Sequence, residues 1–367
     1  MTFRNRGVRA TAPDLYLPSN PQTLLAALAS ALGQGHPAQI VYLDDAAPLP
    51  DHVRAAIQRR FPDISLSVRS DREAIAEFAN LPRFLPAVLR RNLAFRRGRG
   101  LCRPADAPPA WLGPHYRTAH IYLSGNFLSK TLRRRCDTLV LREEGLLNYH
   151  SLRFGPGKAL LRLASGKSPR RHYMGEESWI DRIELDDPQA LPPRLRAKAR
   201  QLGLAQLMQR LSPELARDIA ALFWQGPLPD LRQGGALLLT QPLDQVGICS
   251  TAEKQAIYRT IRDRLTQAGL NVVIKRHPRE ADRADATDDE VSLPAFFPIE
   301  AWPWLTRQKF DLAVALCTAA LNTRGGLFSH RQVQLVDPGP FGRKQLGDWQ
   351  GRLDRLCAEY RPPAAAG

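Results

Sequence analysis

Paired cysteines and long apolar runs are the first things this chain lacks. Its 367 residues include five cysteines, which are scattered and form no CxxC pair. This pattern argues against a structural zinc site or a disulfide framework. No stretch of about 18 apolar residues occurs, so we expect no membrane-spanning helix. The basic N-terminus leads into no signal-type apolar run, and we therefore expect a cytoplasmic protein, with room for peripheral contact with the inner membrane.

Two further shortages concern nucleic acids and metals. Aromatic residues make up only 7% of the chain, and it carries no helix-turn-helix, zinc-finger or RNP-like signature. Both absences weigh against a nucleic-acid-binding protein. No D-x-D triplet occurs, and no histidine and carboxylate spacing suggests metal ligands. We therefore expect neither a bound metal nor a cofactor.

Positive charge is what the chain has in excess. Its formal net charge is +16, and the arginines cluster at residues 90–91, 96–99, 133–135 and 170–171. Such clusters attract anionic partners: a phosphorylated ligand, an acidic polysaccharide, nucleic acid or a membrane surface. They are equally explained as a solvated basic surface, so the charge alone does not choose among these.

The order of apolar and polar segments alternates between strand and helix. We expect strands at residues 15–18, 39–45, 64–70, 120–126 and 137–145, then at 236–243, 271–278, 310–316 and 333–337. Helices are expected between them, among them 72–95, broken by Pro82 and Pro86, and 204–224, 251–269, 298–305 and 346–360, with a mobile loop at 281–290. Residues 150–200 are rich in Gly, Pro and Arg, and we expect them to form irregular surface structure with a basic face. Such alternation predicts parallel sheets covered on both faces.

A proline- and glycine-rich stretch at residues 225–235 separates the two series of strands. We therefore predict two doubly wound α/β domains of Rossmann type. The first spans residues 1–228, the second spans 229–345, and a C-terminal helix and tail complete the chain at 346–367.

Polar residues follow the predicted strands where each ends. In open α/β sheets, ligands bind beyond the carboxyl ends of the strands. The polar residues found there are Ser19, Asn20, Asn126, Glu143, Glu144, Gly145, Thr240, Gln241, Lys275, His277, Pro278, Cys317 and Thr318. Two such edges facing each other would form one cleft, the layout of a GT-B glycosyltransferase.

The motifs at these edges resemble the bacterial sialyltransferase and polysialyltransferase group. That group carries an acidic-acidic-Gly motif in its first domain and a His-Pro motif in its second. Here they are Glu143-Glu144-Gly145 and His277-Pro278, and LPAFFPIE, ending at Glu300, resembles the group's P-x-E element. One departure is the Ser/Thr pair that follows, which reads Cys317-Thr318 and so supplies a hydroxyl only from Thr318.

In the first domain, the acidic pair suggests a general base. Transfer to a sugar requires deprotonation of an acceptor hydroxyl, and a partly buried carboxylate beside another can accept that proton. The resemblance favours Glu143 over Glu144, and Gly145 allows the tight turn beside a sugar. The plainer alternative pairs these carboxylates with Arg142 or Arg134 on an ordinary loop.

In the second domain, basic and hydroxyl side chains suit a nucleotide. His277 would stabilise or protonate the departing CMP phosphate, and Lys275 would hold the donor as a point charge. Thr318 could bind the same phosphate or act as an N-cap. The resemblance implies that Glu300 accepts hydrogen bonds from the ribose hydroxyls, and the alternative is that it simply begins a helix. Pro278 shapes the turn, and Thr240 and Gln241 are candidates for the base pocket.

The resemblance to this group implies an inverting, metal-independent transferase that moves sialic acid, or a related nonulosonic acid, from a CMP donor to a glycan. The acceptor is expected to be a glycan and could itself be anionic. A donor such as CMP-Kdo or a UDP-hexose remains an alternative, because one fold hosts many donors. A non-catalytic basic protein that binds glycans or nucleic acid is the alternative from another class.

Overall fold

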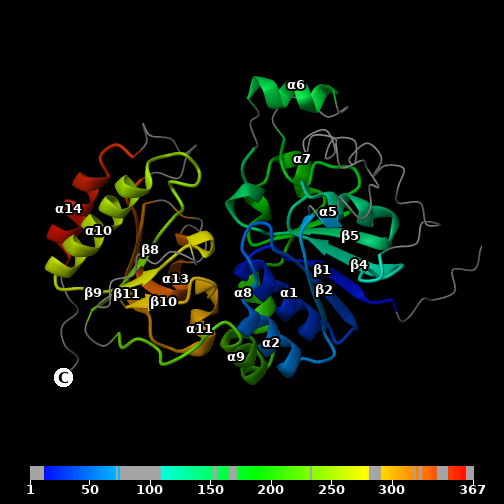
Figure 1. Ribbon diagram of the computed structural model, residues 1–367, viewed down its shortest axis with the longest axis horizontal. Helices are drawn as coiled ribbons and strands as arrows, with labels where there is room; N and C mark the ends of the chain where they lie inside the picture. Colours follow the sequence, from blue (N-terminus) through cyan, green and yellow to red (C-terminus); the bar gives the residue numbers. More distant parts are fainter. Residues whose placement is uncertain are drawn as a thin grey trace, which may run out of the picture. The chain divides into compact units, whose positions relative to one another are not determined.

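The computed structural model divides the chain into two compact units, Met1–Ser212 and Pro213–Gly367 (Figure 1). It describes residues 12–71, 73–74, 109–151, 155–164, 172–231, 234–280, 291–316, 318, 320–321, 325–336 and 346–360. In this part of the chain, no helix combines the length and the apolar character needed to cross a membrane.

The first unit is built on a seven-stranded sheet in the order β3-β2-β1-β4-β5-β6-β7, with every pairing parallel. The strands are β1 (Asp14–Leu17), β2 (Ala38–Leu43), β3 (Ser65–Arg69), β4 (Tyr116–Ile121), β5 (Cys136–Arg142), β6 (Arg182–Leu185) and β7 (Ala199–Gln201). The order runs outward in both directions from β1 and β4. This is the doubly wound arrangement, whose ligands bind where the direction reverses.

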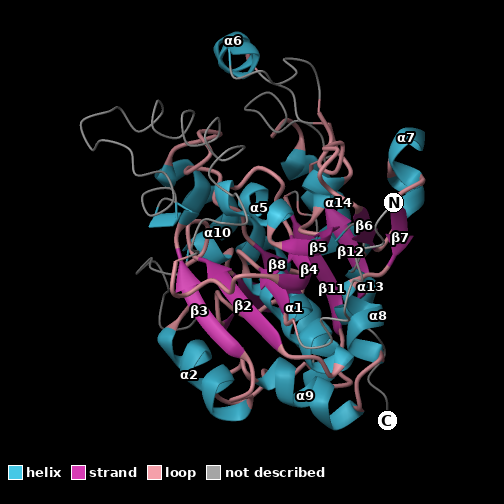
Figure 2. Ribbon diagram, turned by 90° about the vertical axis from the view of Figure 1, so that its right-hand side faces the viewer, coloured by secondary structure: helices cyan, strands magenta, loops and turns pink. Residues whose placement is uncertain are grey.

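The helices of this unit are α1 (Pro21–Gln34), α2 (Asp51–Arg60), α5 (Phe127–Thr131), α6 (Pro156–Ala164), α7 (Pro193–Arg196) and α8 (Leu204–Gln209). Helices α1 and α2 lie on one face and α5 on the other (Figures 1 and 2). The start of α1 is set by Asn20, whose side chain accepts the Thr23 N–H while the Thr23 hydroxyl bonds back to the Asn20 backbone. Gly35 ends the helix in the left-handed conformation.

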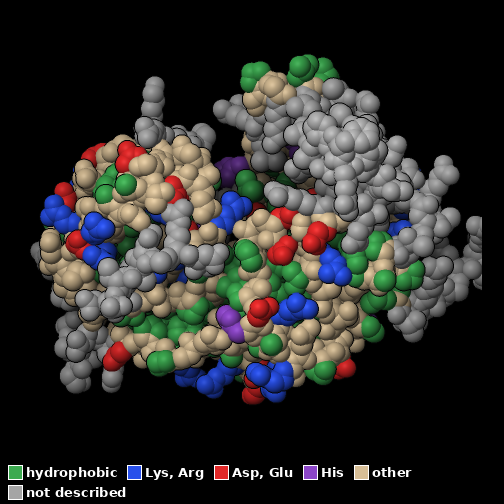
Figure 3. Space-filling view, in the orientation of Figure 1, with side chains coloured by type: hydrophobic (Ala, Val, Ile, Leu, Met, Phe, Trp, Pro, Cys, Tyr) green, Lys and Arg blue, Asp and Glu red, His purple; other side chains and the backbone are tan. Residues whose placement is uncertain are grey.

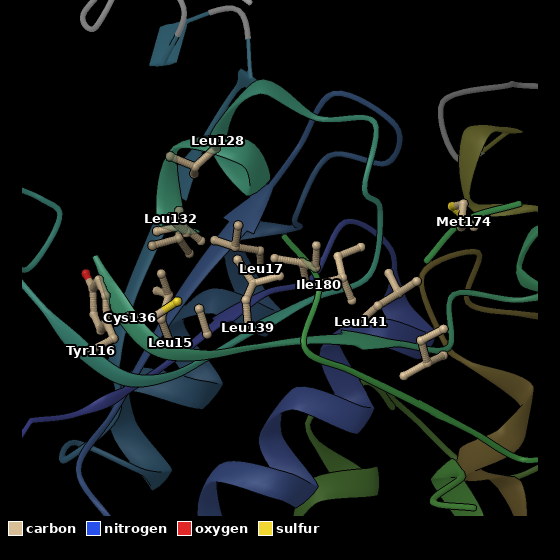
Figure 4. Close-up of a cluster of buried hydrophobic side chains, with 14 of the residues drawn as sticks. Leu15, Leu17, Tyr116, Leu128, Leu132, Cys136, Leu139, Leu141, Met174 and Ile180 are labelled. Carbon is tan, nitrogen blue, oxygen red and sulfur yellow. The ribbon is translucent and has the colours of Figure 1, made fainter. Parts of the chain in front are cut away.

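The two faces of the sheet differ in chemistry because side chains alternate along each strand. Leu15, Leu17, Leu139 and Leu141 point into an apolar core beneath α5 (Figure 4). The residues between them on the strands face α1 and include a buried polar row, which is described with the site below.

The second unit repeats the doubly wound plan with a five-stranded parallel sheet in the order β10-β9-β8-β11-β12. Its strands are β8 (Gly235–Leu239), β9 (Asn271–Lys275), β10 (Ser292–Leu293), β11 (Phe310–Ala315) and β12 (Ser329–Gln334). Its helices are α9 (Pro213–Ala221), α10 (Thr251–Gln267), α11 (Trp302–Leu305), α13 (Gly325–Phe328) and α14 (Trp349–Glu359). Leu353 and Leu356 of α14 share one core with Ile261 and Leu265 of α10, so the last helix is part of this unit.

The two α/β units confirm the predicted fold class, while several boundaries differ. The predicted helix at 204–224 is two helices, because Ser212 and Pro213 interrupt it, and the units divide there and not at residue 228. The stretch 150–200, predicted to be irregular, contains α6, β6, α7 and β7. The predicted helix at 72–95 falls almost wholly outside the described residues, as does the loop at 281–290.

Candidate active site

Glu143 lies directly beyond β5 and remains tied to the sheet. Its backbone N–H donates to the Glu184 carbonyl at 3.0 Å, so it extends the strand pairing by one residue. Its side chain is buried, and Oε2 accepts the Asp186 N–H at 2.7 Å and the Tyr149 hydroxyl at 3.0 Å. Burial and the charge of Glu143 raise the pKa of Tyr149. The phenol therefore stays a proton donor to the carboxylate at neutral pH.

Glu144 and Gly145 form the turn that follows. Both backbone N–H groups donate to Oδ1 of Asn148, at 2.8 and 3.1 Å. Gly145 has φ of +152°, and a Cβ there would contact nothing within 4 Å. The backbone conformation therefore requires the glycine, whereas crowding does not. The space beside the acidic pair is open at this position. Asn148 was not singled out from the sequence, although Asn is among the residues that turns favour.

The N-terminal end of α1 meets this turn. Asn20, the N-cap of α1, directs Nδ2 to Oε1 of Glu144 at 3.4 Å, so the carboxyl edges of β1 and β5 come together as predicted. Ser19 is buried, and its N–H bonds to Thr23 Oγ1 at 3.0 Å. Asn126 occupies the N-cap position of α5, beyond β4, without a side-chain capping bond.

A buried polar row runs across the face of the sheet toward α1. His120 stacks on Tyr16 with ring centroids 4.5 Å apart, and its Nδ1 accepts Nε–H of Arg142 at 3.0 Å. Arg142 in turn pairs with Glu184 at 3.0 Å. Burial, reinforced by the charge of Arg142, lowers the pKa of His120, so this imidazole is neutral. The row holds β5 in place directly before Glu143, and it was not predicted from the sequence.

In the second unit, His277 follows β9 and is held by its backbone. Its N–H lies 3.2 Å from both Thr240 Oγ1 and Glu280 Oε2. Its ring Nδ1 accepts the Arg279 N–H at 3.2 Å, which places the ring proton on Nε2. Burial, and then the charge of Lys275, lowers the pKa of His277 to about 4. The ring is therefore a neutral Nε2–H donor at physiological pH.

The carboxylate of Glu280 holds this turn in place. It is buried, accepts the Thr240 hydroxyl at 2.6 Å and pairs with Nζ of Lys254 at 2.6 Å. Lys254 also approaches Asp244 at 3.3 Å. This ion-pair network joins β8, α10 and the His-Pro turn, and neither Glu280 nor Lys254 was identified from the sequence.

Lys275 occupies a different position from the expected one. Instead of extending outward as a point charge for the donor, its buried Nζ donates to the backbone carbonyls of Arg276 and Ala295. Burial lowers its pKa to about 7, and the charges of Glu300 and Glu280 act in the opposite direction. Lys275 therefore anchors the loop that leads to buried Glu300, and it brings these two predicted residues together.

The remaining predicted residues border the same edge of the second sheet. The Gln241 N–H donates to the Tyr258 hydroxyl at 2.7 Å, and Pro278 begins the 3₁₀ turn Pro278–Glu280. Thr318 is held by Gln334, which bonds both its N–H and its carbonyl, and its Oγ1 accepts the Ala320 N–H at 3.3 Å. Cys317 lies outside the described residues.

Among the residues that the structure describes, no group of three His, Cys, Asp or Glu side chains is arranged to hold a metal ion.

A protein-family model, alpha-2,8-polysialyltransferase (POLYST), matches residues 134–337, which is more than half of the chain. The chain belongs to this family. The matched range contains the acidic pair with Gly145, the His-Pro turn, Glu300 and Thr318, and the protein is thus a glycosyltransferase of the sialyltransferase kind.

Two solved structures resemble the chain in their overall trace. A Photobacterium damselae sialyltransferase, residues 113–497 corresponding to its GT-B domain, is 11% identical, with TM-score 0.43, and the alignment covers 94% of this chain and 96% of that one. An alpha,alpha-trehalose-phosphate synthase (UDP-forming) from Burkholderia vietnamiensis is 12% identical, with TM-score 0.40 and coverage of 95% and 90%. No curated protein sequence matches the chain significantly. Each of the two units has the doubly wound strand order of a Rossmann-type domain.

Proposed function

We propose that the protein is an inverting, metal-independent transferase that moves sialic acid, or a related nonulosonic acid, from a CMP donor to a hydroxyl of a glycan. One observation carries most of this proposal. The Arg279 N–H is committed to Nδ1 of His277, which makes the ring a donor through Nε2 at the carboxyl edge of a doubly wound sheet. That edge is where nucleotides bind in such sheets.

The chemical step is a single displacement at the anomeric carbon. The acceptor oxygen forms a bond to that carbon while the bond from the carbon to the CMP phosphate oxygen breaks, and the electron pair leaves with CMP. Glu143 accepts the acceptor's hydroxyl proton. The Tyr149 hydroxyl and the Asp186 N–H both hold Oε2, and so they orient the carboxylate for this transfer.

His277 stabilises the leaving phosphate by a hydrogen bond. With a pKa of about 4, the ring holds no second proton at neutral pH, which favours hydrogen bonding over proton donation. CMP departs as a phosphate monoester, which tolerates its own charge, so protonation is not required. Thr318, whose Oγ1 already accepts a backbone N–H, contributes its O–H to the same phosphate.

The nucleoside would be held by the loop between β10 and α11. We assign Glu300 to the ribose hydroxyls, and Lys275 positions that loop through the Ala295 carbonyl. Thr240 and Gln241 border the base, as the sequence suggested. In this arrangement, hydrogen-bond donors of the protein stabilise the phosphate in place of a divalent cation. Transfer activity should therefore persist in excess EDTA, which tests this part of the proposal.

The acceptor side of the proposal is a glycan whose hydroxyl reaches Glu143 through the open space at Gly145. The arginine clusters favour an anionic acceptor and contact with an anionic membrane face.

Calorimetric titration with CMP and UDP, each with and without EDTA, tests the donor. We expect metal-independent CMP binding that is lost in His277→Ala and kept in His330→Ala, a matched control because His330 is an exposed histidine of the same unit. A preference for UDP would instead favour a hexose donor. Binding of neither nucleotide, with salt-sensitive binding of an oligonucleotide, would remove the transferase proposal. CMP-sialic acid and CMP-Kdo are then compared in a transfer assay.

A further inference from the structure

The two side chains proposed to bind the donor phosphate carry no positive charge. The His277 ring is neutral at physiological pH because its pKa is about 4, and Thr318 offers only a hydroxyl. Lys275, the cation expected from the sequence, is buried and donates to the carbonyls of Arg276 and Ala295. A cation beside His277 would add Coulomb attraction to what these neutral donors contribute.

Arg279 is an exposed cation on the His-Pro turn. It is the middle residue of the 3₁₀ turn Pro278–Glu280, and its backbone is held on both sides. Its N–H donates to Nδ1 of His277 at 3.2 Å, and its carbonyl accepts Nε2 of Gln245 at 3.1 Å. The bond that orients the imidazole therefore also fixes the starting point of the arginine side chain.

The charge of Arg279 is felt at the ring of His277. Burial is the largest cause that lowers the pKa of this histidine, the charge of Lys275 is the next, and the charge of Arg279 acts in the same direction. Because such an interaction weakens with distance, the guanidinium belongs to the surroundings of the imidazole.

The nearest carboxylate along the chain does not neutralise this guanidinium. Glu280 is buried and is committed to the Thr240 hydroxyl and to Nζ of Lys254. Among the described residues, the structure shows no side-chain partner for Arg279. A cation of this kind attracts an anionic ligand.

Exposure alone would not single out one arginine in this unit. Figure 3 shows basic side chains over its visible surface with acidic ones interspersed. Arg262, Arg264 and Arg331 each have a carboxylate within 2.8–3.5 Å. Arg279 combines exposure, a fixed backbone and a position beside His277 with the lack of such a partner in the described part of the chain.

We propose that Arg279 binds the phosphate of the donor nucleotide together with His277. This inference rests on the proposed function, because it requires a CMP donor at the carboxyl edge of the second sheet. The planar guanidinium can donate two hydrogen bonds to phosphate oxygens, while Nε2–H of His277 donates to another. Arg279 thereby supplies the positive charge that a divalent cation would otherwise provide.

The same contact would assist the chemical step. The donor phosphate is a diester with one negative charge, and it gains charge as its bond to the anomeric carbon breaks. Attraction to Arg279 therefore increases toward the transition state, which is the condition for a contact to accelerate a reaction.

Calorimetric titration of the full chain with CMP and with cytidine, which has no phosphate, tests the inference. We expect Arg279→Gln to lower the affinity for CMP roughly tenfold or more and to leave the affinity for cytidine unchanged. Arg279→Lys should keep part of the affinity, because it keeps the charge and loses the planar fork. Added salt should weaken CMP binding more in the wild type than in Arg279→Gln.

Arg307→Gln is the matched control. Arg307 is also exposed, but it precedes β11 and so lies at the end of the sheet opposite to the carboxyl edge. This variant should bind CMP and cytidine like the wild type.

Three results would overturn the inference while leaving the proposed function in place. They are wild-type CMP affinity in Arg279→Gln, an equal loss for CMP and cytidine, which would indicate a distorted turn, and a loss in Arg276→Gln in place of Arg279→Gln. If the wild type binds no CMP, the proposed function fails and this inference fails with it.

Discussion

Glu143 and Glu144 are adjacent in sequence but sit in different surroundings. The Glu143 carboxylate is buried and held by the Tyr149 hydroxyl and the Asp186 N–H, whereas Glu144 is half-buried and meets the amide of Asn20. A proton acceptor needs a defined orientation, and Glu143 has the better defined one.

Replacing Glu143 with Gln therefore separates the two roles. Loss of a general base costs about 10²- to 10⁴-fold in turnover. We expect Glu143→Gln to lower transfer by at least the smaller factor while CMP affinity stays unchanged. Glu144→Gln is the matched control and should cost much less. Near wild-type turnover in Glu143→Gln, or an equal loss in Glu144→Gln, would contradict the assignment of the base.

Tyr149 offers a second test at this scale. Tyr149→Phe removes the hydroxyl bonded to Oε2 of Glu143 and keeps the aromatic ring. We expect turnover to fall roughly 10- to 100-fold, with unchanged CMP affinity and donor KM, because one charge-assisted hydrogen bond contributes roughly 1.5–3 kcal/mol. Tyr173→Phe is the control, since Tyr173 also borders the same core. A changed donor KM would indicate a different role for Tyr149.

The pKa of His277 makes stability depend on pH in a defined direction. It falls from 6.5 to about 4 on burial, so between these pH values the unfolded chain binds a proton here that the folded chain does not. The free energy of unfolding therefore falls as pH drops from 6.5 to 4, by about 3 kcal/mol at most.

Urea unfolding at pH 7 and pH 4.5 measures this. Between the two conditions the wild type should lose about 2 kcal/mol more than His277→Gln, because the variant has no imidazole to protonate. His330→Gln should behave like the wild type. An identical loss in the wild type and His277→Gln would show that the half-buried imidazole takes up a proton as readily in the folded chain as in the unfolded one.

The candidate chemistry-bearing residues were easier to single out from the sequence than the residues that hold them in place. Glu143 and His277 stand out because they follow apolar strands within short motifs. Lys254 and Glu280 do not, because their contact joins positions 26 residues apart that only the folded sheet brings together. The sequence also gave no sign of the position of Lys275, because a Lys at the end of a strand is usually exposed to solvent. The structure shows that its side chain is buried and bonds to the Ala295 carbonyl.

At the scale of elements, the ion-pair network around Glu280 connects β8, the His-Pro turn and α10. We expect Glu280→Gln to lower CMP affinity about tenfold and to destabilise the protein by about 3 kcal/mol, because Lys254 loses a buried partner. Glu359→Gln is the control, since the Glu359 side chain is 65% exposed. Titration and urea unfolding provide the two measurements.

A double-mutant cycle with Thr240→Val distinguishes positioning of His277 from general stability. Thr240 and Glu280 bond each other and share the His277 N–H, so their effects on CMP affinity should be strongly non-additive. Additive losses would mean that the two residues act on CMP independently.

Strands with continuous apolar sequence were predictable, and short ones were not. The segment 236–239 is wholly apolar and was identified, whereas β6 reads RIEL and follows a stretch rich in Gly, Pro and Arg. Its Glu184 is buried because Arg142 pairs with it, a compensation that local sequence does not reveal. The break at Ser212-Pro213 follows from known proline chemistry, but the apolar periodicity on both sides concealed it.

At the scale of the whole molecule, CMP should act first on one unit. The residues proposed to bind it lie between positions 240 and 318, all within the second unit. Hydrogen exchange should therefore slow in peptides covering 240–241, 271–280 and 310–318 when CMP is added, because a ligand of the folded state suppresses local opening. His277→Ala should abolish this protection. Protection confined to residues 12–212 would place the nucleotide in the first unit.

The two-unit plan was predicted from strand and helix alternation, but strand order was not. Parallel neighbours are joined by crossovers, so adjacency in the sheet leaves no short-range signal comparable to a hairpin turn.

The central position of β1 has a consequence for biosynthesis. One edge of β1 pairs with β2. The other edge pairs with β4, where Leu15 lies opposite Ala119, and β4 is synthesised much later. A ribosome adding about 5–20 residues per second needs roughly 5–20 s to supply that partner. Throughout this interval the nascent chain presents an unpaired apolar edge, which invites aggregation. Raised chaperone levels should accordingly increase the soluble yield of the recombinant enzyme, whereas slower translation, which lengthens this interval, should lower it.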